Sequence, residues 1–570
     1  MDSTVELGLD RYLVPFSFRQ VPLYRFDVVV VGGGCAGSTA ALAAAEQGAS
    51  VALVTKAELK ESNTLYAKGG MAAVLASDDS YDRHVAETLQ VGCGLGDRET
   101  VETVVRGGPS AVERLVKLGT LFDRTSEGEL QLSREGGHSR HRIVHAHGDA
   151  TGLEIQRALS EAVAGHPNIA VFPGHFAIDL LSASDDSPPP QRILGVLTRS
   201  ERGELVAFGA SQTILASGGA GQIYRETTNP AIATGDGVAL GIRAGAIARD
   251  CEFFQFHPTC LYIAGAARVL ISEVVRGAGG VLCDRNGVRF MPDYHDDAEL
   301  APRDVVSRAV FARMVETADT SVYLDLSGID QDPHALFPAI SRVCRFFGID
   351  IARDPIPVRP GAHYMIGGLR VDLDGRTSVS NLWAVGEVAC SGLHGANRMG
   401  SNSLLEGVVL GLRAGNAAAR EMNGIDLSGL RNTFTGTKTK PPAGLRLNIT
   451  DLTYSLKSLM WRQMGVVRNA EGMQDALEKL AFWSHAVRDL ADADARVWEL
   501  VNMLTVSRLA TLCALAREES RGVHYREDFD APVDAWRAHT LITPRFEGDS
   551  PRTVHISREP VTGGVSQVAV

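Results

Sequence analysis

Apolar runs that end in glycine-rich turns organise the first part of the chain. Residues 28–31 are four consecutive valines, a pattern typical of a strand buried on both faces of a parallel sheet. The run ends in Gly32-x-Gly34-x-x-Gly37 and continues into residues 38–45, where alanine and leucine favour a helix. Residues 49–54 form another apolar run of strand length. The pattern therefore predicts a strand–turn–helix–strand unit at the start of an α/β domain.

The later apolar pattern divides the rest of the chain. Residues 168–215 are typical of a β-rich segment, residues 381–388 return to the buried-strand pattern, and residues 451–520 show long helical periodicity. The segment from residue 251 to residue 364 has helices of its own, such as residues 304–316. We therefore predict an α/β, Rossmann-like nucleotide-binding domain in two pieces, an inserted α+β capping domain, and a C-terminal helical bundle with a loose polar tail after Phe546. The predicted ranges are residues 1–250 and 365–430 for the first domain, 251–364 for the second, and 431–570 for the third, with a linker at 435–442.

Composition narrows the class of protein. The chain has 570 residues and a formal net charge of −12, which argues against nucleic acid or an anionic membrane as the main partner. It has neither a secretory signal pattern nor an apolar run long enough to span a bilayer. Its eight cysteines form no CxxC pair, which disfavours a zinc ribbon or iron–sulfur cluster and favours reduced thiols. A cytoplasmic enzyme fits all of these features.

The glycine turn is the context that a dinucleotide-binding fingerprint requires. Gly32 makes the turn, Gly34 allows close approach of the pyrophosphate, and Gly37 allows helix and strand to pack. The alternative is a glycine-rich turn of the kind found in any α/β protein. The position after the second strand, where an acid usually holds the NAD ribose, is Thr55 followed by Lys56. A NAD site is therefore less favoured, and Glu387, just past a later strand, is the better candidate for binding a sugar or polyol hydroxyl.

A few polar residues favour an anionic substrate. His257, Arg303, His363 and Arg398 lie outside the expected core patterns, and arginine forks bind carboxylates bidentately. Together they would suit a small dicarboxylate, although each alone has the simpler interpretation of a structural or surface residue. Residues 133–152 contain four histidines, but no acidic or cysteine partner has metal-ligand spacing, so the sequence predicts no metal site.

The full set of motifs resembles the succinate dehydrogenase/fumarate reductase flavoprotein superfamily. The motifs occur in family order over residues 26–415, and Glu519-Ser520-Arg521-Gly522 extends the match toward the end of the chain. They are Gly32-x-Gly34-x-x-Gly37, Ala67-Lys68-Gly69-Gly70, Phe256-His257-Pro258-Thr259, Ala301-Pro302-Arg303-Asp304, Ala362-His363-Tyr364-x-x-Gly367-Gly368, Gly386-Glu387-Val388 and Leu393-His394-Gly395-Ala396-Asn397-Arg398-x-x-Ser401-Asn402-Ser403-Leu404.

Two departures place the chain nearer to the branch of this superfamily that oxidises L-aspartate. Asn63 stands where the succinate branch usually has the histidine that bonds covalently to FAD, so the resemblance implies non-covalent FAD. Glu135 stands where that branch usually has an aromatic residue, and its carboxylate could pair with the α-ammonium group that succinate lacks.

The resemblance also implies roles for individual residues. Arg303, His257 and His363 would be catalytic, with Arg303 relaying a proton. Substrate would be bound by Glu135, Gln255, Thr259, Ser272, Arg398 and Ser401. FAD would be bound by Gly32, Gly34, Ala36, Gly37, Thr55, Lys56, Ser62, Asn63, Thr64, Gly69, Gly70, Asp236, Glu387, Ser403 and Leu404.

The implied reaction is oxidation of L-aspartate to iminoaspartate, the first step of quinolinate synthesis for NAD. Oxygen or fumarate would reoxidise the flavin, and the product would pass to quinolinate synthase. One alternative is a succinate dehydrogenase or fumarate reductase flavoprotein subunit, which would require an iron–sulfur partner. A flavin-dependent RNA-modifying or scaffold protein is another, which the acidic charge and the lack of a basic stripe disfavour.

Overall fold

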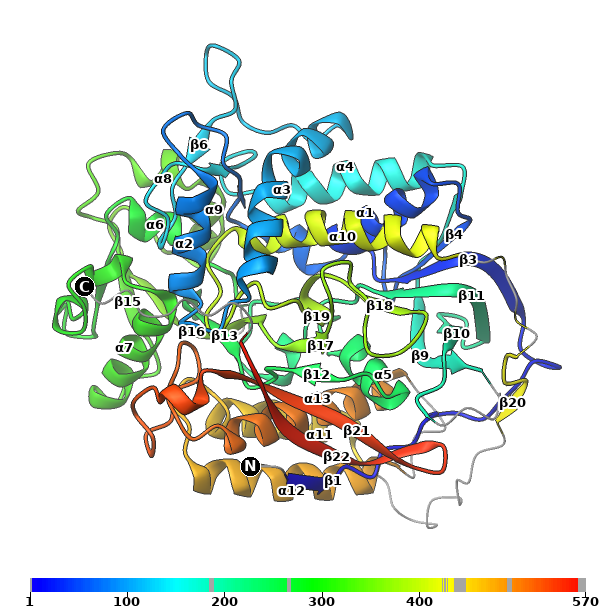
Figure 1. Cartoon of the computed structure of the whole chain (residues 1–570). Helices are drawn as coiled ribbons and strands as arrows, with labels where there is room; N and C mark the ends of the chain where they lie inside the picture. The colour runs from blue at the N-terminus through cyan, green and yellow to red at the C-terminus, as the bar shows by residue number, and fades with distance from the viewer. Residues whose placement is uncertain are drawn as a thin grey trace.

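A seven-stranded sheet forms the first part of the computed structural model, which describes residues 3–183, 189–263, 268–422, 424, 427, 429–434, 447–488 and 495–561 (Figure 1). Its main strand order is β8–β4–β3–β11–β10–β9, and β18 also pairs with β11. The pairs β8–β4, β4–β3, β3–β11 and β11–β18 are parallel, whereas β10 is antiparallel to both its neighbours. The strands are β3 (Leu23–Val31), β4 (Val51–Val54), β8 (Ile169–Phe172), β9 (His175–Ser182), β10 (Ile193–Ser200), β11 (Leu205–Leu215) and β18 (Leu382–Ala384).

The four valines of β3 explain why this strand is central. Val28 and Val30 belong to one hydrophobic cluster, whereas Val29 and Val31 belong to another. All four are at most 6% exposed, because successive side chains of a strand point to opposite faces and both faces are covered here. The predicted buried parallel strand is therefore confirmed.

Helices cover both faces of this sheet. On one side they pack into the cluster that contains Val28, and they lie together above the sheet in Figure 1. They are α1 (Cys35–Glu46), α3 (Arg98–Lys117), α4 (Thr151–Gly165) and α10 (Asn402–Arg420), with α2 (Tyr81–Val91) packed on α3. The cluster on the other face includes α5 (Asp236–Ala244) and the C-terminal helices α11 (Ile449–Gln463), α12 (Ala470–Arg488) and α13 (Ala495–Ala516).

An antiparallel sheet with its own core lies within the predicted capping segment. Its strand order is β13–β16–β15–β14, and its helix α7 (Arg303–Glu316) packs on β13. The strands are β13 (Phe254–Leu261), β14 (Val281–Cys283), β15 (Val322–Asp325) and β16 (Ile356–Met365), and the shorter helices are α6 (Glu273–Gly277), α8 (Pro333–Leu336) and α9 (Pro338–Phe346). A separate hydrophobic cluster joins these elements. The α/β fold with a helical C-terminal part is confirmed, while the exact domain boundaries stay a prediction.

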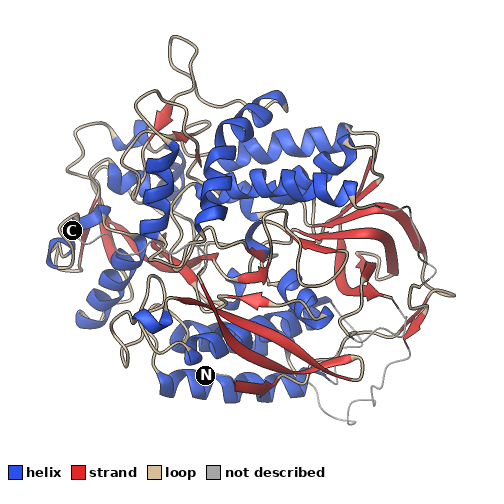
Figure 2. Ribbon diagram, in the orientation of Figure 1, coloured by secondary structure: helices blue, strands red, loops and turns tan. Residues whose placement is uncertain are grey.

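The C-terminal segment differs from the prediction of a loose tail. Strands β21 (Ala538–Glu547) and β22 (Ser550–Pro560) form a long hairpin, visible beside the C-terminal helices in Figure 2. The hairpin belongs to a six-stranded sheet of order β1–β22–β21–β12–β17–β19, so residues 538–560 are held by distant partners. Those partners are β1 (Ser3–Glu6), β12 (Ala248–Arg249), β17 (Gly368–Arg370) and β19 (Ala389–Cys390). The predicted linker at 435–442 lies outside the described residues.

The remaining named strands form two small sheets. Strands β5 (Met71–Ala72), β6 (Leu132–Ser133) and β7 (Ile143–Val144) form one sheet, and β2 (Phe16–Ser17) pairs with β20 (Thr433–Phe434). Helix α13 is long and apolar enough to cross a membrane, but 78% of its apolar window is buried inside the protein. Its apolar character therefore follows from its place in the core.

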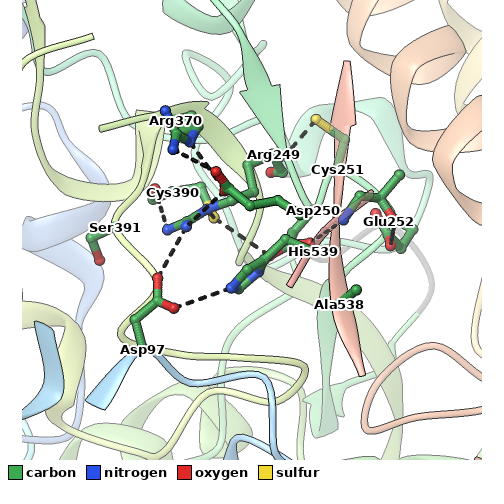
Figure 3. Close-up of polar contacts among 12 residues, drawn as sticks. Asp97, Arg249, Asp250, Cys251, Glu252, Arg370, Cys390, Ser391, Ala538 and His539 are labelled. Carbon is green, nitrogen blue, oxygen red and sulfur yellow. Dashed lines mark hydrogen bonds and ion pairs between the residues drawn. The ribbon is translucent and has the colours of Figure 1, made fainter. Parts of the chain in front are cut away.

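A buried ionic cluster fastens the hairpin to the nucleotide-binding part (Figure 3). The ring of His539 on β21 donates through Nδ1 to Asp250 Oδ2 at 2.6 Å and through Nε2 to Asp97 Oδ1 at 3.2 Å. Because both ring nitrogens face carboxylate acceptors, the imidazole is protonated. Arg249 Nη1 also contacts Asp97 Oδ2, at 3.0 Å. Asp97 is the N-cap residue of α3, so the cluster joins the hairpin to the start of this helix.

Candidate active site

A cavity of about 540 Å³ lies where the glycine turn, the capping elements and the start of α10 meet. Most residues predicted to bind cofactor or substrate line it, although they come from segments up to about 370 residues apart. The lining includes Gly32, Gly34, Ala36, Thr55, Lys56, Ser62, Asn63, Thr64, Gly69, Gly70, Glu135, Asp236, His257, Ser272, Arg303, His363, Glu387, Arg398, Ser401, Ser403 and Leu404. Three predicted residues do not line it: Gly37, Gln255 and Thr259.

The glycine turn gives the cavity an end suited to phosphate. Gly34, the N-cap of α1, has no side chain, and the first turn carries no acidic residue; the Cys35 N–H donates to the neutral hydroxyl of Thr64. The helix therefore presents its positive end to the cavity without a competing anion. Gly32 has a φ of +115°, and a Cβ there would lie 2.2 Å from the Ala216 carbonyl oxygen. At Gly37 a Cβ would lie 2.0 Å from the Gly32 carbonyl oxygen, so Gly37 serves packing behind the turn.

Asn63 and Glu387 form a polar pair further along the cavity. Asn63 Nδ2 donates to Glu387 Oε2 at 2.9 Å, and the Met365 N–H donates to Glu387 Oε1 at 2.9 Å. Burial raises the pKa of Glu387. Asn63 Oδ1 is buried and has no hydrogen-bond partner among the residues that the structure describes, which is costly unless a ligand supplies a donor. A polyol chain or sugar with free hydroxyls fits this pair, and the amide has no atom that could attach covalently to a flavin.

Other predicted cofactor residues brace the turns that shape the cavity. Thr64 Oγ1 accepts from the Cys35 N–H at 3.0 Å, and Ser62 Oγ donates to Gln156 Oε1 at 2.9 Å. Thr55 Oγ1 donates to the Ala57 carbonyl at 2.7 Å, so its hydroxyl is already used in its own turn. These contacts hold the backbone of the turns in place. Direct contact with a ligand is therefore made by backbone groups and by the side of each side chain that faces the cavity.

Lys56 connects the cavity to the C-terminal helices. Its ammonium lies 2.8 Å from Asp236 Oδ2 and 2.7 Å from Glu499 Oε1 on α13. Asp236 also accepts from Asn502 Nδ2 on the same helix, at 2.8 Å. The cavity wall at Lys56 and Asp236 is therefore held by α13, a link that local sequence patterns do not reveal.

Two arginines converge at the opposite end of the cavity. Gln255 Oε1 accepts from Arg398 Nη1 at 3.2 Å and from Arg303 Nη1 at 3.4 Å. The Gln255 amide nitrogen donates to Asn397 Oδ1 at 3.0 Å and to the Arg398 carbonyl at 2.7 Å, which fixes the direction of the amide. Gln255 is fully buried. Gln255 therefore lies behind the cavity wall and orients the two guanidinium groups. The prediction that it contacts the substrate directly is wrong.

Glu273 is a site residue that the sequence prediction missed. It lines the cavity, and its Oε2 lies 2.7 Å from Arg303 Nε and 3.8 Å from Arg276 Nη2. Burial alone would raise the pKa of Glu273, but Arg303 and Arg276 lower it to about 2. The sequence did contain a signal for Glu273. It directly follows the predicted Ser272, and its spacing from Arg276 puts both residues on one helical turn. Ser272 is the N-cap of that helix, accepting from the Val274 N–H.

The two histidines lie together between the arginines. The rings of His257 and His363 meet edge to face, with centroids 5.3 Å apart. Burial, with Arg303 and His363 nearby, holds the pKa of His257 well below its usual value, and burial with Arg398 does the same for His363. His257 Nδ1 accepts from the Thr259 N–H at 3.3 Å, so the neutral ring carries its proton on Nε2. Thr259 is fully buried and supports His257 without lining the cavity.

Glu135 supplies a carboxylate near Arg303 and Arg398. Its Oε2 accepts from Ser401 Oγ at 2.7 Å, and burial raises its pKa. Ser401 has a φ of +61°, an uncommon conformation for a residue with a side chain. A Cβ at Gly69 would lie 2.5 Å from Glu135 Oε1, and one at Gly400 would lie 2.6 Å from Glu135 Oε2. Only glycines therefore leave room for this carboxylate.

Comparison with known families agrees with this geometry. Residues 27–404 match the model of the FAD binding domain, and residues 453–568 match that of the fumarate reductase flavoprotein C-terminal domain. The chain is 41% identical to an L-aspartate oxidase of Streptomyces coelicolor, over 94% of each chain. It is 45% identical to an L-aspartate oxidase of Mycobacterium bovis, over 89% of this chain and 93% of that one. The likeness to a chloroplastic L-aspartate oxidase of Arabidopsis thaliana is 43%, over 91% and 83%.

Solved structures share the fold. A mutant E. coli quinol fumarate reductase FrdA is 31% identical, with a TM-score of 0.86 over 96% of this chain and 99% of that one. Sdh1 of Mycobacterium smegmatis, in complex with UQ1, is 30% identical, with a TM-score of 0.82 over 96% of each chain. FAD is the cofactor that the matched domain model names. The α1 terminus, which has no acidic residue in its first turn, fits the phosphate groups of FAD, and the Asn63 oxygen and Glu387 fit its hydroxyl groups.

Proposed function

The chain belongs to the L-aspartate oxidases of the succinate dehydrogenase/fumarate reductase flavoprotein superfamily, and on this basis we propose that it oxidises L-aspartate to iminoaspartate. One observation carries the choice of substrate. Glu135 faces the same cavity as Arg303 and Arg398. The second carboxylate at this end, Glu273, is already paired with Arg303 and Arg276, so Glu135 is the carboxylate left to pair with a substrate cation. This charge pattern is complementary to aspartate, which has one ammonium and two carboxylate groups.

The protein residues bind and orient the substrate. Arg398, His363 and His257 hold the carboxylates, and Glu135 pairs with the α-ammonium group, which compensates its buried charge. Ser272 adds a hydroxyl at the cavity wall. FAD, when bound, supplies the two-electron acceptor that takes the α-hydrogen with its electron pair. Loss of this hydride and of one N–H proton converts the C–N single bond of the aspartate ammonium form into the C=N bond of protonated iminoaspartate, and loss of a second N–H proton gives the neutral imine.

Arg303 is the residue proposed to relay the proton. Its guanidinium contacts Glu273 and donates to Gln255 Oε1, the same acceptor that Arg398 uses. An ionised Glu273 keeps Arg303 charged and in place, and a guanidinium is a poor base at neutral pH. Arg303 therefore stabilises charge in the transition state and relays a proton along the Glu273–Arg276 side of the cavity.

Three features of its cellular role are proposed with this activity. The electron acceptor is oxygen or fumarate, and fumarate suits a cavity that already binds a four-carbon dicarboxylate. Iminoaspartate hydrolyses readily in water, so we propose that it passes to the quinolinate synthase that uses it on the way to NAD. We place the protein in the cytoplasm, in keeping with its acidic charge.

Succinate oxidation is the rival function, because the fold matches quinol fumarate reductase and Sdh1 closely. The test is anaerobic addition of L-aspartate, D-aspartate or succinate to the purified, FAD-loaded protein. We expect L-aspartate to bleach the flavin absorbance, and D-aspartate and succinate to leave it largely oxidised. Bleaching by succinate but not by L-aspartate would overturn the proposal in favour of its rival.

A further inference from the structure

Arg398 rests on the face of an aromatic ring whose hydroxyl is bound by a buried carboxylate. Its guanidinium carbon lies 4.6 Å from the centroid of the Tyr364 ring, and the Tyr364 hydroxyl donates to Glu406 Oε2 at 3.2 Å. We propose that Glu406 and Tyr364 are positioning residues: the carboxylate orients the ring, and the ring holds Arg398 where it binds a substrate carboxylate. The inference rests on the proposed role of Arg398 in dicarboxylate binding.

Glu406 is built into the protein as an ionised acceptor. It lies in the second turn of α10, is 2% exposed, and accepts from two groups besides Tyr364. His394 Nε2 donates to Glu406 Oε2 at 3.0 Å, and Ser391 Oγ donates to Glu406 Oε1 at 2.5 Å. Burial acts to raise the pKa of Glu406, but His394 and these hydrogen bonds lower it. A buried carboxylate with three donors has one stable position.

This position determines the orientation of the Tyr364 ring. The ring packs edge to face against His394, with centroids 5.1 Å apart and planes at 85°. Its hydroxyl end is held by Glu406 and by His394, whose Nε2 lies 3.2 Å from the Tyr364 oxygen, and its face is left for Arg398. Donation of the hydroxyl proton to a carboxylate also makes the ring richer in electrons, which strengthens its attraction for a cation.

Arg398 is held by neutral partners. Within the described part of the chain its guanidinium forms no salt bridge: Nη2 donates to Ser403 Oγ at 2.7 Å, Nη1 donates to Gln255 Oε1 at 3.2 Å, and Nε has no acceptor. Burial and the nearby Arg303 lower the pKa of Arg398 to about 10, so it stays protonated at neutral pH. An ion-pair partner inside the protein would compete with the substrate, whereas an aromatic face stabilises the cation and leaves its charge available.

This arrangement predicts an effect on binding more than on the chemical step. A group that holds Arg398 acts on ground state and transition state alike, so its loss raises KM and the dissociation constant while kcat changes little. The matched variants are Tyr364→Phe, which keeps the ring and removes the hydroxyl, and Glu406→Gln, which keeps the shape and removes the charge. Tyr364→Leu removes the ring.

The experiment measures succinate binding to each oxidised, FAD-loaded variant by calorimetry, together with KM and kcat for L-aspartate. We expect Tyr364→Phe and Glu406→Gln each to raise the dissociation constant about 2- to 10-fold, as for loss of one hydrogen bond. Tyr364→Leu should raise it about 30-fold. The double variant, which combines Tyr364→Phe with Glu406→Gln, should be no worse than the weaker-binding single variant, because Glu406 acts through Tyr364.

Tyr224→Phe is the matched control, since Tyr224 is fully buried and its hydroxyl donates to the Met464 carbonyl away from the cavity. It should leave succinate binding unchanged. Succinate affinities of Tyr364→Phe and Glu406→Gln within twofold of the parent, at equal FAD content, would overturn the inference. Failure of the parent protein itself to respond to any dicarboxylate would instead refute the proposed function.

Discussion

The Ser401 hydroxyl donates to Glu135 Oε2 at 2.7 Å and accepts from the Gly70 N–H at 3.1 Å. One side chain thus connects the carboxylate proposed to bind the substrate ammonium with a glycine turn in the cofactor part of the cavity. The uncommon backbone conformation of Ser401 is what directs its hydroxyl between the two groups. The placement of Glu135 is therefore determined by the same turn that shapes the cofactor site.

Glu135→Gln should weaken L-aspartate binding selectively. The amide keeps the hydrogen bond from Ser401 but cannot neutralise an ammonium group. We expect KM for L-aspartate to rise about 10- to 100-fold, as for loss of a charge-assisted hydrogen bond. Succinate has no ammonium group, so its dissociation constant should not rise. Equal weakening of both ligands would contradict the assignment of Glu135.

Arg303→Leu should abolish most turnover without loss of FAD. The variant removes the group proposed to relay the proton and stabilise charge, and kcat should fall about 100- to 10,000-fold. Arg303→Lys retains a cation but not the geometry of a fork, and should recover only a small part of the activity. Near-parental turnover of Arg303→Leu with L-aspartate, measured at full FAD occupancy, would refute the proton-transfer role.

FAD should be released completely when the protein is precipitated with acid. Asn63 offers no covalent attachment, so the yellow colour is expected in the supernatant and none in the washed pellet. Glu387→Ala should raise the dissociation constant for FAD about 10-fold, measured by fluorescence titration of the apoprotein. Glu46→Ala, at the exposed end of α1, is the control and should bind FAD normally. Flavin that stays with the pellet would contradict the non-covalent assignment.

Stability should fall as the pH rises above neutrality because of His539. Burial acts to lower the pKa of His539, but its aspartate partners, Asp250 before Asp97, raise it from an ordinary value of 6.5 to about 9. Because the folded pKa is the higher one, the stabilisation is complete below pH 6.5 and is lost as the pH rises through 9. The rise in pKa from 6.5 to about 9 corresponds to about 3 to 4 kcal/mol, at about 1.4 kcal/mol per pKa unit.

The measurement for His539 is the free energy of unfolding, or the Tm, between about pH 6 and pH 10, a range that spans both pKa values. His539→Gln should be less stable than the parent at the acidic end of this range and should lose the His539 contribution to the pH slope. His141→Gln, at an exposed position, should keep the parental curve. A His539→Gln curve parallel to that of the parent would show that the imidazolium is not the group responsible.

Local patterns were sufficient for the parts of the fold that depend on neighbouring residues. The valine run, the glycine turn and the following alanine-rich helix lie within about 20 residues, so their periodicity and turn chemistry predicted β3 and α1 directly. The cavity residues that were predicted come from short motifs at strand ends or in turns. Glu135 needed more, because only comparison with the family pattern separated it from an ordinary surface charge.

The predicted residues that lie outside the cavity depend on register and on distant partners. Simple alternation puts Gln255, His257 and Thr259 on one face of β13, but register shifts on both sides of His257 break that alternation, and only His257 reaches the cavity. The hairpin of residues 538–560 was missed although its two strands pair locally across the turn at Gly548. Its attachment to β1 and β12, hundreds of residues away, leaves no signal in a local window.

The pairing of β1 with β22 has a consequence for the timing of folding. Ser3 lies opposite Ile556 and Glu6 opposite Thr553, so β1 is synthesised about 550 residues before the strand with which it pairs. At typical synthesis rates the N-terminal strand is without its partner for about 30 to 110 seconds. The nascent chain therefore carries β1 as an unpaired strand until β22 has been made. A domain fused directly before residue 3 should obstruct this pairing and reduce the yield of soluble protein more than the same domain fused after residue 561.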